Sequence, residues 1–220
     1  MTWSSYFALI GVWLAAIVSP GPDLLQIIRV GTKSRRAGVA CACGIMLGNI
    51  IWILGSLLGL SALLQAAPQI LAVLQLVGGG YLLYMGLGAL RSGLLVRRQQ
   101  IADAATSANA QLSAANHLSP RRALGVGLAT NLSNPKAVLF FAAVFAQFVK
   151  PAMGWQWTLV IVATLAVLGI AWFVGFALLV DKIGAWLAKH RHWVDVVTGL
   201  IFVALAGWMI VESLTHIAAT

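Results

Sequence analysis

Residues 5–28 read SYFALIGVWLAAIVSPGPDLLQII, an apolar stretch that Pro20, Gly21 and Pro22 interrupt near its middle. A transmembrane helix needs roughly 20 apolar residues, so this stretch is long enough to cross a bilayer. Proline inside a helix removes a backbone hydrogen bond, and in hydrocarbon such a break survives only where protein or a wet cavity covers it. The stretch therefore predicts a transmembrane helix that is broken at these three hinge residues.

The composition of the whole chain indicates a membrane protein. Of its 220 residues, 61% are hydrophobic and 9% are charged, whereas a soluble domain is typically about 25% charged. Apolar stretches of membrane-spanning length run approximately over residues 5–28, 38–62, 69–90, 122–148, 156–180 and 195–215. We therefore expect an all-α integral membrane protein, with six transmembrane helices in one domain over residues 1–220.

The basic residues are concentrated in alternate gaps between these stretches. The first, third and fifth gaps hold twelve of the 14 Lys and Arg residues, and the second and fourth gaps hold one. Cytoplasmic loops carry such an excess of Lys and Arg, so these three gaps are predicted to be cytoplasmic and both termini to lie outside. The same distribution explains the net charge of +9 without nucleic-acid binding.

The third gap divides the chain into two halves of three helices, at about residues 1–92 and 121–220. The cytoplasmic linker between them, about 93–120, is rich in Ala, Ser, Gln and Asn over residues 99–119. A shift of 114 positions places Ser19 on Ser133, and both halves are then interrupted at the same place. An odd number of helices per half inverts the second copy, and inverted repeats with broken helices are typical of transporters.

The second interruption has the sequence of a helix start. Asn134 is a favourable N-cap, Pro135 is suited to the first helical position and acts as a hinge, and Lys136 follows. Unpaired N–H groups, the positive end of the helix dipole and a lysine would then meet inside the membrane. This combination predicts a site for an anionic group such as a carboxylate.

Asp23 directly follows the first interruption and is the only acid well inside a predicted span. An isolated carboxylate in a membrane is a functional candidate, either for a substrate ammonium, for a coupling proton, or for both. The alternative is that Asp23 and Lys136 pair as a structural latch between the halves.

Four further polar residues are expected at the same depth and are predicted as substrate contacts: Ser19, Asn131, Ser133 and Asn49. Each of them alone is also explained by packing between helices. Two small-residue patterns, Gly44/Gly48 and Gly55/Gly59, predict close helix packing within the fold or in a homodimer. Trp52 and Trp172 lie deep in their stretches and are expected to line a cavity.

The sequence offers no set of residues for catalysis or for a cofactor. No His lies inside a predicted span, no Walker A pattern occurs, and neither paired acids nor a Ser/His/Asp set share one depth. Cys41 and Cys43 are two residues apart on a helix and point in different directions, which argues against a disulfide or a metal site. We therefore expect no cofactor, no metal and no enzymatic activity.

Three motifs resemble those of a known family. Ser19-Pro20-Gly21-Pro22-Asp23, the segment 131–137 (NLSNPKA) and the segment 77–82 (VGGGYL) are similar, in order and spacing, to the motifs of the lysine-exporter/RhtB superfamily of amino-acid exporters. The first two motifs look most like the threonine and homoserine efflux branch. The resemblance implies export of amino acids across the bacterial inner membrane, driven by the proton gradient.

Alternatives to this function remain open at the level of the sequence. A related exporter of basic or branched-chain amino acids would share the same motifs. A membrane-embedded enzyme would need clustered acids or a metal site, and a membrane assembly protein would not need a charged residue at each break.

Overall fold

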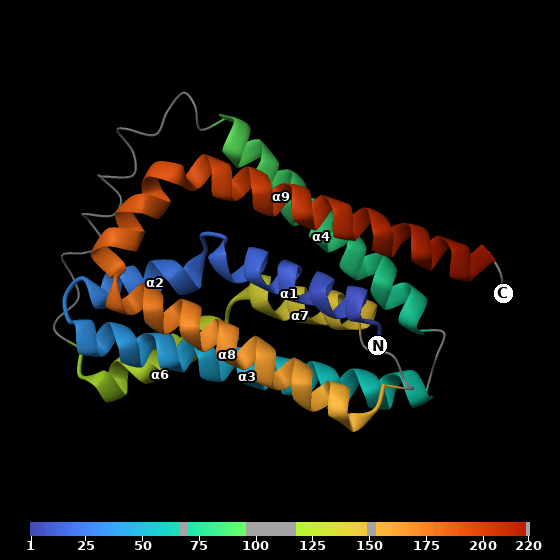
Figure 1. The fold of residues 1–220 in the computed structure, drawn as a ribbon, viewed down its shortest axis with the longest axis horizontal. Coiled ribbons are helices and arrows are strands. Elements are labelled where there is room, and N and C mark those ends of the chain that lie inside the picture. Colours follow the sequence, from blue (N-terminus) through green and yellow to red (C-terminus); the bar gives the residue numbers. More distant parts are fainter. Residues whose placement is uncertain (67–69, 96–117, 149–152, 219–220) are drawn as a thin grey trace.

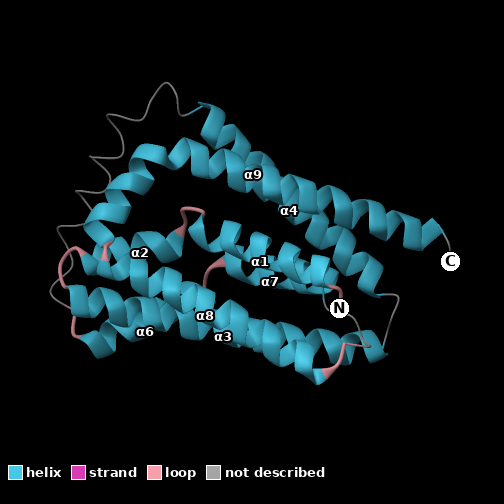
Figure 2. Ribbon diagram, viewed as in Figure 1, coloured by secondary structure: helices cyan, strands magenta, loops and turns pink. Residues whose placement is uncertain are grey.

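The computed structural model describes residues 1–66, 70–95, 118–148 and 153–218, and every regular element in them is an α-helix (Figures 1 and 2). The helices are α1 (Trp3–Val18), α2 (Pro22–Gly31), α3 (Arg35–Ala66), α4 (Ile70–Leu95), α6 (Pro120–Leu132), α7 (Pro135–Phe148), α8 (Trp155–Leu178) and α9 (Val180–Ala218). The expected all-α fold is therefore confirmed. Most of the predicted linker lies outside the described residues.

The first predicted break is present between α1 and α2. α1 ends at Val18, α2 begins at Pro22, and the two helices are bent by 50°. Gly21 occupies the N-cap position, so Pro22 stands at the start of α2, where a missing N–H costs no helical hydrogen bond. The local sequence is sufficient to explain this break.

The second predicted break separates α6 from α7. α6 ends at Leu132, and α7 begins at Pro135. The side-chain oxygen of Asn134 accepts a hydrogen bond of 3.0 Å from the backbone N–H of Lys136, and the Asn134 carbonyl accepts one from Ala137. Asn134 therefore caps α7 as its sequence predicts.

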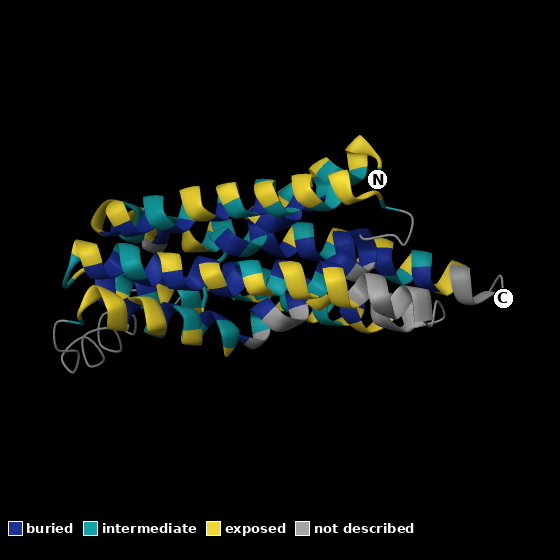
Figure 3. Ribbon diagram, turned by 90° about the horizontal axis from the view of Figure 1, so that it is seen from below, coloured by how far each residue is buried: buried dark blue, intermediate teal, exposed yellow. Residues whose placement is uncertain are grey.

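Several helices are long and apolar enough to cross a membrane. They include Arg35–Gly59 within α3, Trp155–Leu178 as α8 and Lys189–Thr215 within α9, and the bent pair α1–α2 meets the same criterion as one span. Many large apolar side chains are exposed on the bundle, as expected where lipid rather than water is the solvent. Figure 3 shows exposed residues along the outer helices.

The gap between the last two apolar stretches, around residues 181–194, is helical. α8 ends at Leu178, Leu179 is its C-cap, and α9 begins at Val180 and continues through residues 181–194. Arg191 and Asp195, one turn apart, form an ion pair of 3.5 Å there. Charged residues end an apolar stretch, but they do not end a helix. Hydropathy therefore predicts where a span leaves the membrane and not where its helix ends. Figure 1 shows α9 turning before it runs beside α4.

α1 and α7 lie between two groups of helices in Figure 1 and contact both of them. α4 packs along α9 on one side, while α3 packs against α6 and α8 on the other. All four half-helices therefore meet near the middle of the bundle, where the two breaks bring their ends together.

Glycines allow the closest helix contacts. A Cβ on Gly44 would overlap the Leu124 carbonyl, and one on Gly48 would lie 2.5 Å from the side-chain oxygen of Asn131. The first small-residue pattern thus packs α3 against α6 within the fold. A Cβ on Gly55 or on Gly59 would have no described atom within 4 Å. The pattern Gly55/Gly59 therefore makes no close helix contact within the described part of the fold.

Candidate functional site

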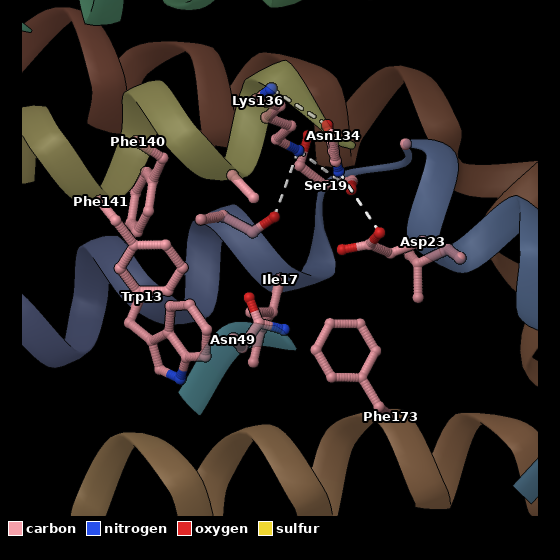
Figure 4. A pocket seen from close by; sticks show the side chains of 14 residues that line it. Trp13, Ile17, Ser19, Asp23, Asn49, Asn134, Lys136, Phe140, Phe141 and Phe173 are labelled. Atoms are coloured by element: carbon pink, nitrogen blue, oxygen red, sulfur yellow. Dashed lines mark hydrogen bonds between the residues drawn. The ribbon is translucent and has the colours of Figure 1, made fainter. Parts of the chain in front are cut away.

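The Lys136 side chain reaches from the start of α7 to the end of α1. Its ammonium nitrogen donates hydrogen bonds to the carbonyls of Ala16, at 3.2 Å, and Ser19, at 3.4 Å (Figure 4). The last carbonyls of a helix have no intrahelical donor and carry the negative end of its dipole. The cation is therefore unfavourable for its own helix but is compensated by the C-terminal end of α1.

Trp172 of α8 satisfies a further carbonyl at this helix end. Its indole N–H donates to the carbonyl of Ile17 at 2.9 Å. Trp52 is partly buried, and its indole N–H has no hydrogen-bond partner among the described residues. Neither tryptophan is among the residues that line the cavity described below.

Asp23 lies in the first turn of α2, where the helix dipole favours a carboxylate. One carboxylate oxygen accepts a hydrogen bond of 2.9 Å from the amide of Asn131, and the other accepts one of 3.4 Å from Asn134. Asn131 belongs to the last turn of α6 and Asn134 to the cap of α7. The start of α2 is thus held by residues that flank the other break.

Two buried asparagines extend this network. Asn131 is fully buried, and its amide nitrogen also donates to the side-chain oxygen of Asn49 at 3.2 Å. The amide nitrogen of Asn49 and the side-chain oxygen of Asn131 have no partner among the described residues. Buried polar groups are seldom left unpaired, so these two groups can still serve a bound molecule or water.

No ion pair joins Asp23 to Lys136, although both residues are described by the structure. Each is instead held by groups at a helix end, the carboxylate by two amides and the ammonium by two carbonyls. The latch in the form of a direct Asp23–Lys136 pair is not made in this structure.

A cavity of about 40 Å³ lies where the helix ends meet, and we call it the junction cavity (Figure 4). It exceeds the roughly 10–15 Å³ that one water molecule requires. Its polar side chains are Ser19, Asp23, Asn49, Asn134 and Lys136. A carboxylate and an ammonium thus line the same small cavity without neutralising each other by direct contact.

Comparison with known proteins identifies the family. A family model described as LysE type translocator matches residues 14–213. The chain belongs to this family. It is 31% identical over 212 residues to the threonine efflux protein of Salmonella typhi, which covers 94% of this chain and 98% of that protein.

Two further relatives are similar to the chain over at least 80% of its length. The threonine efflux protein of Escherichia coli K12 is 28% identical over 204 residues, 91% of this chain and 95% of that protein. An uncharacterized membrane protein of Pseudomonas aeruginosa is 32% identical over 179 residues, 80% of this chain and 79% of that protein. No solved structure gives a significant match. The resemblance found in the motifs is confirmed, and this translocator is a multi-pass bacterial membrane protein.

The structure brings most of the predicted site residues of the translocator together. The five polar residues that line the junction cavity were all predicted as site residues, and Gly21 of the predicted hinge also lines it. Asn131 does not line it but contacts Asp23 and Asn49. Ser133 is the exposed C-cap of α6 and lies apart from the cavity, so its predicted contact with substrate receives no support from the geometry.

The apolar wall of the junction cavity was not predicted from the sequence. The wall includes Trp13, Phe140, Phe141 and Phe173, all buried. The indole N–H of Trp13 donates to the Leu165 carbonyl at 3.2 Å, which fixes the ring. The two phenylalanines follow Lys136 by about one helical turn, and this spacing on α7 was the available signal.

Proposed function

We propose that this translocator exports a small neutral amino acid, threonine- or homoserine-like, from the bacterial cytoplasm in exchange for protons. The observation that carries the proposal is the presence of Asp23 and Lys136 on one cavity without an ion pair between them. A zwitterionic amino acid has the complementary pair of charges. The names of two relatives, both threonine efflux proteins, support the choice of substrate class.

The substrate carboxylate would bind at the start of α7. Lys136 supplies an ammonium there, and Asn134 and Pro135 begin the helix whose positive dipole end faces the same point. The bonds from Lys136 to the end of α1 are to neutral carbonyls, and a charged carboxylate is the stronger acceptor. The incoming carboxylate can therefore replace one of them.

The substrate ammonium would bind at Asp23, and the unpartnered amide nitrogen of Asn49, a donor, would be available to an oxygen of the substrate. The same carboxylate would carry the coupling proton. A protonated Asp23 has lost the charge that attracts an ammonium, so proton and substrate exclude each other. This exclusion would couple outward movement of the amino acid to inward movement of protons.

The proposed architecture has six spans in two inverted halves of three, about residues 1–92 and 121–220, joined by the cytoplasmic linker. The spans would be α1–α2, α3, α4, α6–α7, α8 and α9. The ends of α1 and α6, Val18 and Leu132, differ by the shift that aligns the two halves in sequence. In addition, the end of α1 faces the start of α7 through Lys136, and the end of α6 faces the start of α2 through Asp23.

This arrangement places both breaks at one depth, with the basic gaps in the cytoplasm and the protein in the inner membrane. Relative rocking of the halves would expose the junction cavity to either side in turn. Because the cavity is small as it stands, we expect the halves to separate when the amino acid enters.

Transport by the purified protein tests the proposal. Proteoliposomes would be loaded with labelled threonine, homoserine, lysine or leucine, and efflux would be followed with and without an imposed pH gradient. We expect threonine or homoserine to leave fastest, and only with protein and gradient present. Faster efflux of lysine or leucine would correct the substrate class, and no efflux of any amino acid would overturn the proposed function.

A further inference from the structure

A second and larger cavity lies at the other end of α1 and α7. Its volume is about 230 Å³, against about 40 Å³ for the junction cavity. It is lined by the beginning of α1, the end of α7 and the C-terminal part of α9, with Thr2, Ser5, Gln147, Phe148, Trp208 and Glu212 among its residues. We call it the Glu212 cavity after its one carboxylate. The proposed function so far makes no use of it.

The chemistry of this cavity suits an organic ammonium. The amide of Gln147, itself 4% exposed, donates to one oxygen of the Glu212 carboxylate and fixes its position. The rings of Phe148 and Trp208 meet edge to face, with centroids 5.9 Å apart, on the same cavity. A carboxylate beside aromatic faces attracts a cation both by charge and through the ring quadrupole.

No cationic partner occupies the Glu212 carboxylate in the part of the chain that the structure describes. Among the side chains that the structure describes, to which those of Lys150 and His216 do not belong, neither a nitrogen of Lys, Arg or His nor the N-terminal nitrogen makes an ion pair with it. Glu212 also lies near the end of a membrane-spanning stretch, Lys189–Thr215.

The two cavities share the same pair of helices. On α7, Phe141 lines the junction cavity and Gln147 lines the Glu212 cavity, about 9 Å further along the helix at 1.5 Å per residue. Between them α1 and α7 pack buried apolar residues, including Leu9, Val12 and Val144. A short closed segment of the α1–α7 interface therefore separates two polar cavities.

We propose that the Glu212 cavity is a second binding site, which holds the ammonium group of the amino acid on the outer side of the closed segment. This inference rests on the proposed function for its role in transport, and on the predicted topology for its position outside. The ammonium would first bind Asp23 at the junction cavity and then Glu212 before release. Binding of an ammonium at Glu212 does not itself require transport, so the two proposals can fail separately.

The binding test uses propylammonium chloride as the probe and the full chain in lipid nanodiscs. All variants carry Asp23→Asn, which removes the carboxylate of the junction cavity. Saturation-transfer NMR then compares this background with the addition of Glu212→Gln, and with Asp181→Asn as a matched control. Asp181 is exposed and lies in the first turn of α9. Its replacement by Asn removes the same charge at the opposite end of the helix.

We expect Glu212→Gln to weaken propylammonium binding at least about tenfold, since a charge-assisted contact is lost, while Asp181→Asn leaves it unchanged. Binding of the neutral probe 1-propanol should not differ among the three proteins. Glu212→Asp, which keeps the charge, should bind more tightly than Glu212→Gln. Equal propylammonium binding with and without Glu212→Gln would overturn the proposed site, whether or not any amino acid is transported.

The role in transport is tested in oriented membrane vesicles that carry otherwise unmodified protein. We expect Glu212→Gln to raise the half-saturating threonine concentration for exchange from the outer face at least about tenfold. The half-saturating concentration at the inner face should change much less. An equal change on both faces would overturn the outer position of the site. A wild-type protein that exchanges no amino acid, but binds propylammonium through Glu212, would overturn only the proposed function.

Discussion

Lys136 satisfies two demands with one ammonium group. It lies at the start of a helix, where a cation opposes the dipole, and it contacts the end of another helix, where a cation is favoured. From the sequence, this charge is expected to need compensation, and a bound anion is the expected source of it. The structure supplies neutral carbonyls instead, so the site is stable without substrate and can still exchange partners.

Replacing Lys136 with Ala should weaken threonine binding at least about tenfold, because a charge-assisted contact is worth roughly 1.5–3 kcal/mol. Equilibrium binding to protein in nanodiscs measures this effect, with Lys136→Arg as the control that keeps the charge. A variant that binds threonine normally but has a lower yield of folded protein would favour a purely structural role for Lys136.

Replacing Asp23 with Asn should abolish proton-coupled efflux while the protein remains folded in the membrane. Asparagine keeps the size of the side chain and can still accept hydrogen bonds from Asn131 or Asn134, but it carries neither charge nor exchangeable proton. Efflux from proteoliposomes with an imposed pH gradient measures the loss. Undiminished gradient-driven efflux would remove Asp23 from the mechanism.

At the scale of elements, the contact between α3 and α6 positions the acidic part of the site. Gly48 lies against Asn131, whose amide holds both Asp23 and Asn49. The absence of a side chain on Gly48 therefore determines where this amide lies. Packing between two helices and the geometry of the site are in this way linked through one glycine.

Gly48→Ala should destabilise the protein by about 1–3 kcal/mol, as overpacking of an interior does, and should also weaken threonine binding. Its matched control is Gly55→Ala in the same helix, where a Cβ meets no described atom within 4 Å. We expect this control to be neutral or slightly more stable, since alanine favours helix over glycine. Thermal unfolding in detergent and threonine binding compare the two variants, and equal effects of both would contradict the contact.

The positions of both helix breaks could be predicted from the sequence because proline and capping residues act locally. Pro22 and Asn134 specify helix starts whatever surrounds them. The aromatic wall with Trp13 and Phe173 could not be predicted in the same way. A membrane helix is apolar on its lipid face and on its protein face, so hydrophobicity does not show which aromatic side chains point inward.

For the whole molecule, the distribution of charge predicts how the chain lies in the membrane, and the helix pairing decides what the site contains. Lys136 of α7 contacts the end of α1 and forms no ion pair with Asp23. This choice of partner depends on tertiary packing, which no local sequence pattern encodes. The beginning of α9 was missed for another reason, because a helix can continue into water beyond the membrane span.

The predicted topology can be tested by single-cysteine labelling in a background with Cys41 and Cys43 replaced by Ala. Gln156→Cys, at the exposed start of α8, should react with a membrane-impermeant maleimide in intact cells. Thr32→Cys, at the exposed end of α2, should react only after the cells are opened. The reverse pattern would invert the orientation and place the Glu212 cavity on the cytoplasmic side.

An ammonium group has three N–H donors, and Lys136 already uses contacts to two carbonyls of the first helix. One donor is left for a solute, and a carboxylate that instead replaces one of the two carbonyls would also loosen the end of α1 from the start of α7. In that case, substrate binding and the loosening of α1 from α7 would occur in one step. We expect a bilayer that contains the protein but no amino acid to stay ion-tight, with passive proton leak no greater than that of protein-free liposomes.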